Sequence, residues 1–257
     1  MFLQTGTLCA AGEVSGGQPS PPPSMSAPLT RTSAASTSRR EFFKRAGFGL
    51  GAVAVASTLA ACDSDDPVDG DVVTLDFSSD VGVLNYAYAL EQLEAGFYAT
   101  VVANAAFSSA FSTDEQAILR DIAAHEGIHR DFFAAAIAGA GATAIPALTP
   151  NFDSVDFSSR SNVLAVAQTF EDLGVAAYNG AGQYIQSADY LLIAGKIVSV
   201  EARHASVIAG LITPNTIAAS GVVDSDGLDR ALRPDAVLSA AAPFLRDSIR
   251  AINVPTA

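Results

Sequence analysis

Residues 200–207 read VEARHASV and lie inside the longer apolar run LLIAGKIVSVEARHASVIAGL (191–211). If this run forms a helix, Glu201 and His204 lie three residues apart and share one face. On a face exposed to water, such a pair carries no information. On a buried face, each polar group costs several kcal/mol unless something pairs with it. The rest of the chain therefore has to supply a partner for the pair.

A second Glu-x-x-His pair occurs in AAHEGIHRDFF (123–133), where Glu126 precedes His129 by the same three residues. Glu is scarce after residue 62, where the chain has six Glu against nineteen Asp and only three His. Two such pairs are therefore improbable as coincidences. One Glu-x-x-His is a weak signal, but two on separate apolar helices indicate a common site.

Two further segments, LEQLEAGFYA and FEDLGVAAYN, align with each other. The alignment pairs Glu91 with Glu171 and Tyr98 with Tyr178. The chain thus contains a degenerate repeat, with Glu and Tyr on one helix and Glu-x-x-His on the next. The two tyrosines have two possible interpretations. They are functional residues that trap a radical or bond a ligand, or they are core residues with satisfied hydroxyl groups.

Ala-rich segments with capping and stop signals predict four long helices, over about 81–106, 112–141, 159–186 and 188–211. Asp80 is the expected cap of the first helix, and Thr213-Pro214 ends the fourth. The connections are short, long and short, which predicts an all-α four-helix bundle made of two antiparallel hairpins joined by a crossover. Residues 214–232 read as a loop and 233–252 as a fifth helix interrupted by proline. No segment shows the alternation expected of a strand.

Four buried carboxylates would repel one another and lose their hydration at high cost unless cations neutralised them. Oxygen and imidazole ligands suit iron or manganese, and the chain has no cysteine after Cys62, which excludes a cysteine-ligated metal in this part. This pattern is that of the di-iron or di-manganese carboxylate site.

On these residues the chain resembles the ferritin-like superfamily over about 81–211. More closely, it resembles exported bacterial ferritin-like domain proteins related to plant desiccation-associated proteins. The resemblance implies two Fe or two Mn ions, with Glu126 and Glu201 as the bridging pair. The ligand set that it implies is Glu91, Glu126, His129, Glu171, Glu201 and His204.

Two nearby residues leave alternatives open. Glu94 lies three residues after Glu91 and is an alternative ligand, although the aligned position on the other helix is Gly174. His125 directly precedes Glu126 and points about 100° away from it, so we expect a surface or inter-helix hydrogen-bonding role rather than ligation.

The N-terminal region carries targeting signals. SRREFFK (38–44) is a twin-arginine export motif, and an apolar stretch too short to span a bilayer comfortably follows at 46–61. It ends in LAAC at Cys62, which resembles a bacterial lipoprotein box and implies lipidation of Cys62. The alternative is an ordinary N-terminal anchor helix with an incidental cysteine.

The predicted organisation combines these segments. Residues 1–24 precede Met25, a more natural start, and are expected to be a gene-model extension. The expected order is a disordered N-terminus (1–37), a twin-arginine lipoprotein-type signal (38–62), an acidic tether (63–80), the bundle (81–211) and a C-terminal loop and helix (212–257). We expect the product in the cell envelope or periplasm, anchored to the membrane through lipid.

After residue 62 the chain carries 25 acidic and nine basic residues. A domain this acidic is not expected to bind nucleic acid or anionic lipid through its surface charge. We expect as partners metal ions and O2 or peroxide, and a homodimer is compatible with this pattern. The leading hypothesis is redox chemistry in stress protection. The alternatives are iron storage, which lipid tethering makes awkward, and a non-enzymatic envelope or desiccation protein with a structural or vestigial metal site.

Overall fold

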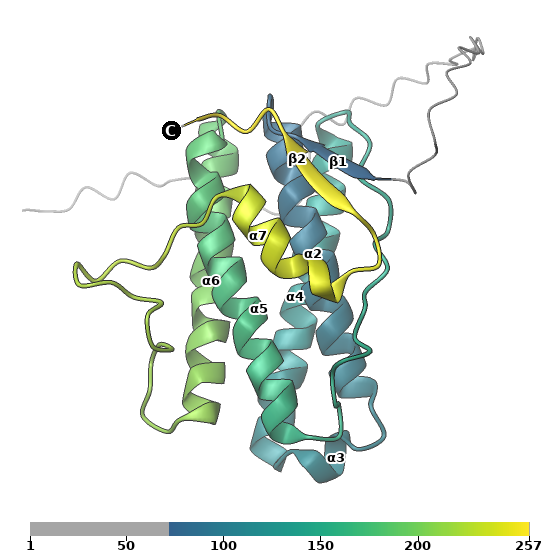
Figure 1. Cartoon of the computed structure of the whole chain (residues 1–257), viewed down its shortest axis with the longest axis vertical. Helices are drawn as coiled ribbons and strands as arrows, with labels where there is room; N and C mark the ends of the chain where they lie inside the picture. The colour runs from purple at the N-terminus through teal and green to yellow at the C-terminus, as the bar shows by residue number, and fades with distance from the viewer. Residues whose placement is uncertain (1–71, 257) are drawn as a thin grey trace, which may run out of the picture.

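The computed structural model describes residues 72–256 (Figure 1). The export motif, the apolar stretch and Cys62 lie outside these residues, so the predictions on them stay predictions. In the described part the chain is mostly helical, as expected for the all-α class. The helices are α2 (Asp80–Ala103), α3 (Phe107–Ala110), α4 (Thr113–Gly139), α5 (Arg160–Ala181), α6 (Ala188–Ile212) and α7 (Pro234–Ala241), with 3-10 turns at Gly182–Tyr184 and Ala242–Phe244 and strands β1 (Val73–Asp76) and β2 (Ile249–Ile252).

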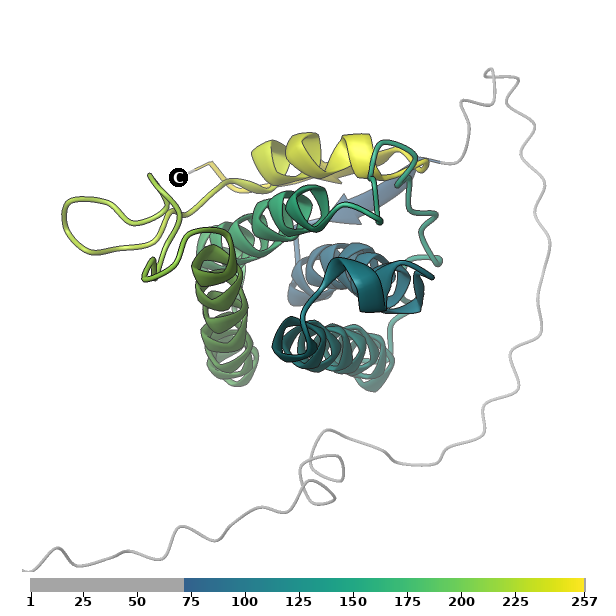
Figure 2. The ribbon, with the colours of Figure 1, turned by 90° about the horizontal axis from the view of Figure 1, so that it is seen from below.

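The four long helices form a bundle of two hairpins, α2 with α4 and α5 with α6 (Figures 1 and 2). Figure 2, which looks along the bundle, shows α7 over α5, on the side of the bundle away from α4 and α6. The side formed by α4 and α6 is therefore not covered by the C-terminal segment. The predicted pair of antiparallel hairpins with a long crossover is confirmed.

Local sequence explains where several of these helices begin. Ser112 and Glu115 form the predicted capping box at the start of α4, with each side chain bonded to the backbone N–H of the other residue. The predicted cap of α2 is wrong, because Ser79 occupies the cap position. The carboxylate of Asp80 instead accepts hydrogen bonds from the backbone N–H groups of Gln186 and Ser187, where α5 turns into α6.

The long crossover between α4 and α5 is fastened to α2 by polar side chains. The Asn85 side chain accepts a bond from the backbone N–H of Ile145, and the Gln92 side chain accepts one from Leu148. These bonds satisfy backbone groups that the crossover would otherwise leave unpaired. The crossover is thereby held along the bundle.

A two-stranded parallel sheet contradicts the expectation of no strands. Val73–Asp76 pairs with Ile249–Ile252, and the tether predicted over 63–80 therefore contains a strand. Val73 and Leu75 are buried on one side of it. The predicted fifth helix is also shorter than expected, because α7 ends at Ala241 and Pro243 lies in a 3-10 turn. Four-residue strands this far apart in the chain are too short for alternation to show them.

None of the helices in the part that the structure describes is both long and apolar enough to cross a membrane.

Candidate metal centre

The six predicted ligand residues come together in the middle of the bundle. Glu91 comes from α2, Glu171 from α5, and one Glu-x-x-His pair comes from each of α4 and α6. The four carboxylates are completely buried, and His129 and His204 are only 8% and 4% exposed. The pair in VEARHASV therefore lies on a buried face.

Two overlapping groups of four can be drawn from these residues. In each group, one ligand atom from every residue lies within 4.8 Å of the others. Glu126 and Glu201 belong to both groups, which matches the bridging roles implied by the resemblance. Glu91 and His129 complete the first group, and Glu171 and His204 complete the second.

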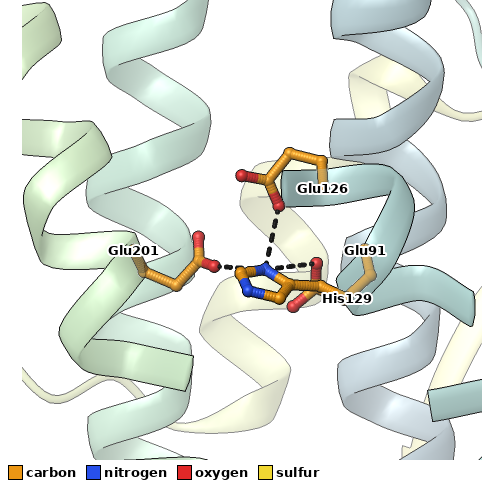
Figure 3. A group of neighbouring side chains, drawn as sticks. All are labelled: Glu91, Glu126, His129 and Glu201. Atoms are coloured by element: carbon orange, nitrogen blue, oxygen red, sulfur yellow. Dashed lines mark hydrogen bonds and ion pairs between the residues drawn. The ribbon is translucent and has the colours of Figure 1, made fainter. Parts of the chain in front are cut away.

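His129 turns its Nδ1 atom toward three carboxylates (Figure 3). Nδ1 lies 2.8 Å from Glu201 Oε1, 3.3 Å from Glu126 Oε2 and 3.5 Å from Glu91 Oε2. These residues come from three helices, so the arrangement depends on how the two hairpins pack.

His204 repeats this arrangement in the second group. Its Nδ1 atom lies 2.7 Å from Glu126 Oε1 and 3.5 Å from Glu171 Oε2. Both imidazoles thus direct Nδ1 into the centre. Their Nε2 atoms are left for other partners.

Burial and repulsion between carboxylates change the protonation of the centre. Burial, opposed in part by hydrogen bonds from the histidines, raises the pKa of Glu91 and of Glu171 to about 7. Burial, reinforced by the charge of Glu91, raises the pKa of Glu201 well above its ordinary value. Without metal, this core therefore retains protons on carboxylates that would be ionised in water.

Glu126 and the histidines shift in the opposite sense. Burial alone would raise the pKa of Glu126, but hydrogen bonds from His129 and His204 outweigh it and lower the pKa to about 2. Burial alone would lower the pKa of each histidine, but the facing carboxylates raise it to about 12 for His129 and about 10 for His204. Protons on these rings therefore provide the positive charge that metal ions would otherwise supply.

Several of the atoms that would ligate a metal lack a well-directed hydrogen bond to any described residue, and this fits a metal site. Buried polar atoms without partners are costly and rare in folded proteins. Six of the nine such atoms identified in the described part of the chain belong to the six predicted ligands. They are Glu91 Oε2, Glu126 Oε1, Glu171 Oε2, both carboxylate oxygens of Glu201 and Nδ1 of His204.

Two tyrosines hold the outer carboxylates. Tyr98 on α2 donates to Glu171 Oε1 on α5, and Tyr178 on α5 donates to Glu91 Oε1 on α2. Each leaves the second oxygen of its carboxylate free to face the centre. Of the alternatives for these tyrosines, the structure agrees with ligand-bonding residues, because each hydroxyl group bonds a predicted ligand carboxylate.

Glu94, the alternative to Glu91, is buried but belongs to neither ligand group. It faces Gly174 on α5, where an added Cβ would lie 3.0 Å from Glu94 Oε1 and 3.6 Å from Glu201 Oε2. Burial, followed by the charge of Glu201, raises the pKa of Glu94 well above its ordinary value. Gly174 has no side chain and so leaves room for this second carboxyl group. Sequence reasoning missed this role of Gly174, although the alignment of the two segments placed it opposite Glu94.

His125 makes the predicted inter-helix bond, because its Nδ1 atom lies 2.9 Å from Nε2 of His204. It lies at the exposed surface of α4 rather than inside the centre. Burial against α6 and the charge of His204 lower the pKa of His125. Sequence reasoning did not identify its partner.

Comparison with known proteins agrees with this architecture. The sequence model of the ferritin-like domain matches residues 79–214, which spans all four long helices and every predicted ligand. No curated protein of similar sequence matches the chain. The matched segment is more than half of the 257 residues, and the chain therefore belongs to the ferritin-like domain family.

Proposed function

We propose that the bundle binds two Fe or two Mn ions and uses them for redox chemistry with O2 or peroxide. The observation that carries this proposal is the pair of overlapping ligand groups that share Glu126 and Glu201. Carboxylate oxygens and imidazole nitrogens suit these metals, and shared carboxylates hold two ions a few ångströms apart. Bound by these residues, such ions would supply redox chemistry toward O2 or peroxide.

An apolar cavity supports access by a small uncharged oxidant. It has a volume of about 30 Å³ and lies between the four long helices. Tyr178, whose hydroxyl group binds Glu91, forms part of its lining together with Leu84, Phe133 and Ile193. The mostly apolar lining suits O2 better than a charged oxidant.

A structural role is the second candidate, and the enclosure of the site favours it. All four carboxylates are completely buried, so the metal ions would be shielded from larger substrates. Metal binding would then stabilise the fold by neutralising the buried carboxylates. This role corresponds to a non-enzymatic stress or desiccation protein of the envelope.

Elemental analysis of protein purified after native export tests both candidates. We expect about two Fe or Mn per chain, as in other carboxylate-bridged sites. A content below about one tenth of an equivalent would contradict both metal-dependent functions. If metal is present, assays of Fe(II) oxidation and of the disproportionation of two H2O2 to two H2O and O2 separate the roles. Stoichiometric metal with neither activity would favour the structural role.

We further propose that the protein is exported by the twin-arginine route and anchored through lipid on Cys62. The support is the sequence SRREFFK followed by LAAC. That route carries folded proteins, so metal could be loaded before export. Replacing Arg39 and Arg40 with Lys should retain the protein in the cytoplasm, and Cys62→Ala should release it from the membrane fraction. Unchanged fractionation of both variants would contradict this proposal.

A further inference from the structure

His125 and His204 form a direct contact between α4 and α6. The Nδ1 atom of His125 lies 2.9 Å from Nε2 of His204. The two rings are nearly coplanar, with centroids 5.1 Å apart and planes inclined by 13°. The contact therefore fixes both the hydrogen-bonding direction and the plane of the His204 ring.

The donor and acceptor in this contact follow from the direction of Nδ1. Nδ1 of His204 faces the carboxylates of the centre. A neutral imidazole that gives its Nδ1 lone pair to a metal carries its proton on Nε2. Nε2–H of His204 then donates to Nδ1 of His125, and Nε2–H of His125 is left for solvent.

The internal repeat shows that this support is present in only one half of the centre. His125 precedes Glu126, but Val200 precedes Glu201. The side chain of Val200 has no atom that accepts a hydrogen bond. Within residues 72–256, no hydrogen bond to Nε2 of His129 is found. Both ligand histidines thus turn Nδ1 toward carboxylates of the centre, but their outer partners differ.

We propose that His125 is a positioning residue that holds His204 and makes the Glu171–His204 half of the centre bind its metal ion more tightly than the Glu91–His129 half. This inference rests on the proposed binding of two metal ions. The partner of the outer nitrogen fixes the tautomer of a ligand histidine and raises its basicity, and its removal typically costs about 10–100-fold in metal affinity. The hydrogen bond to His125 provides both effects for one metal position only.

Each half can be measured alone in a background that disables the other half. Glu91→Gln leaves the His204 half, and Glu171→Gln leaves the His129 half. Metal-free protein of each background is titrated with Mn(II) by calorimetry. His125→Ala should weaken Mn(II) binding about 10–100-fold in the Glu91→Gln background and by less than about twofold in the Glu171→Gln background.

Two further variants separate positioning from a general effect on the fold. His125→Asn places an amide oxygen near the position of Nδ1 and should restore affinity to within about threefold of the background, since the acceptor is what matters. Val200→Ala, at the repeat-equivalent position, should leave both backgrounds unchanged. Circular dichroism on each variant checks that the helices are retained, which the exposed position of His125 favours.

Each outcome has a defined meaning. An equal loss in both backgrounds, no loss in the Glu91→Gln background, or no rescue by His125→Asn would overturn the positioning role while leaving the proposed metal site intact. Failure of the unsubstituted protein to bind Mn(II) or Fe(II) would contradict the proposed function itself, and this inference with it.

Discussion

Tyr98 of α2 donates its hydroxyl hydrogen bond to Glu171 of α5, across the interface between the two hairpins. Tyr178 of α5 returns the same bond to Glu91 of α2. Each hairpin therefore supplies the tyrosine that holds the outer carboxylate of the other hairpin. These crossed bonds couple the packing of the bundle to the geometry of the centre.

Removing one of these hydroxyl groups should destabilise the protein. Tyr98→Phe leaves a buried carboxylate oxygen without its donor, so we expect the free energy of unfolding to fall by about 1–3 kcal/mol. Urea denaturation of the metal-free protein measures this change. Tyr86→Phe is the matched control, because the buried Tyr86 hydroxyl has no hydrogen-bond partner among the described residues and its loss should cost nothing. Equal effects of the two substitutions would contradict the role of the Tyr98 bond.

The shared carboxylates should decide metal binding without deciding the fold. Glu126→Ala combined with Glu201→Ala should abolish metal binding and keep a helical protein, because the change removes buried charge as well as ligands. Chelation should lower the melting temperature of the unsubstituted protein and leave that of the double variant unchanged. Elemental analysis and thermal unfolding followed by circular dichroism check both statements. Retained metal in the double variant would mean that the ligands are misassigned.

The pair of Glu115 and Arg160 should make stability depend on pH. Arg160 Nε donates to Glu115 Oε1 at 2.8 Å and lowers the pKa of this carboxyl group. Because the pKa is lowered, the pair stabilises the fold at pH values above the ordinary pKa of Glu. This stability is lost as the pH falls through the pKa of Glu115 in the folded protein. Glu115→Gln should therefore cost about 1 kcal/mol at pH 7, and this cost should disappear once the pH has fallen below the folded pKa.

Urea denaturation at several pH values follows this loss. Arg160→Gln serves as the partner variant. Arg160 also donates to the backbone carbonyl of Leu211, so the double variant should cost less than the sum of the two single variants, since both remove the bond between the two side chains. A difference that stays constant down to low pH would show that the charge of Glu115 does not contribute.

Close packing against α5 should make one glycine irreplaceable. A Cβ at Gly180 would overlap the backbone carbonyl of Leu232, where the chain enters α7. Gly180→Ala should therefore destabilise the protein by about 3 kcal/mol, since a backbone segment has to move. Gly195 in α6 has open space around it, so Gly195→Ala should stabilise by about 1 kcal/mol through helix propensity. Thermal unfolding compares the two, and a neutral Gly180→Ala would contradict this packing.

Much of the fold is readable from sequence because helices depend on local contacts. Capping residues, helical periodicity and connection lengths predicted the two hairpins, and α4 and α6 lie close to their expected spans. The two Glu-x-x-His pairs were readable for the same reason, since residues three apart share a helix face in any fold. The aligned Glu91 and Glu171 then completed the candidate set.

Other features depend on residues that are distant in the chain. The pairing of β1 with β2 follows from tertiary contacts, and so do the two hydrogen bonds that Asp80 accepts from backbone N–H groups at the turn into α6. Sequence spacing also left Glu91 and Glu94 as alternatives, because both lie on the same side of α2. Their separation into a ligand-group residue and a neighbour of Gly174 required the position of α5.

The sequence by itself determined the candidate ligand residues and the helices on which they lie, because helix formation and side-chain facing are local properties. Only the tertiary structure decided which atoms meet. It turned Nδ1 of both histidines inward, crossed the tyrosines between the hairpins and placed His125 against His204, whereas residues 72–256 provide no such partner for His129. These relations depend on how the two hairpins pack, and hairpin packing brings together residues whose separation in the chain leaves no periodic signal.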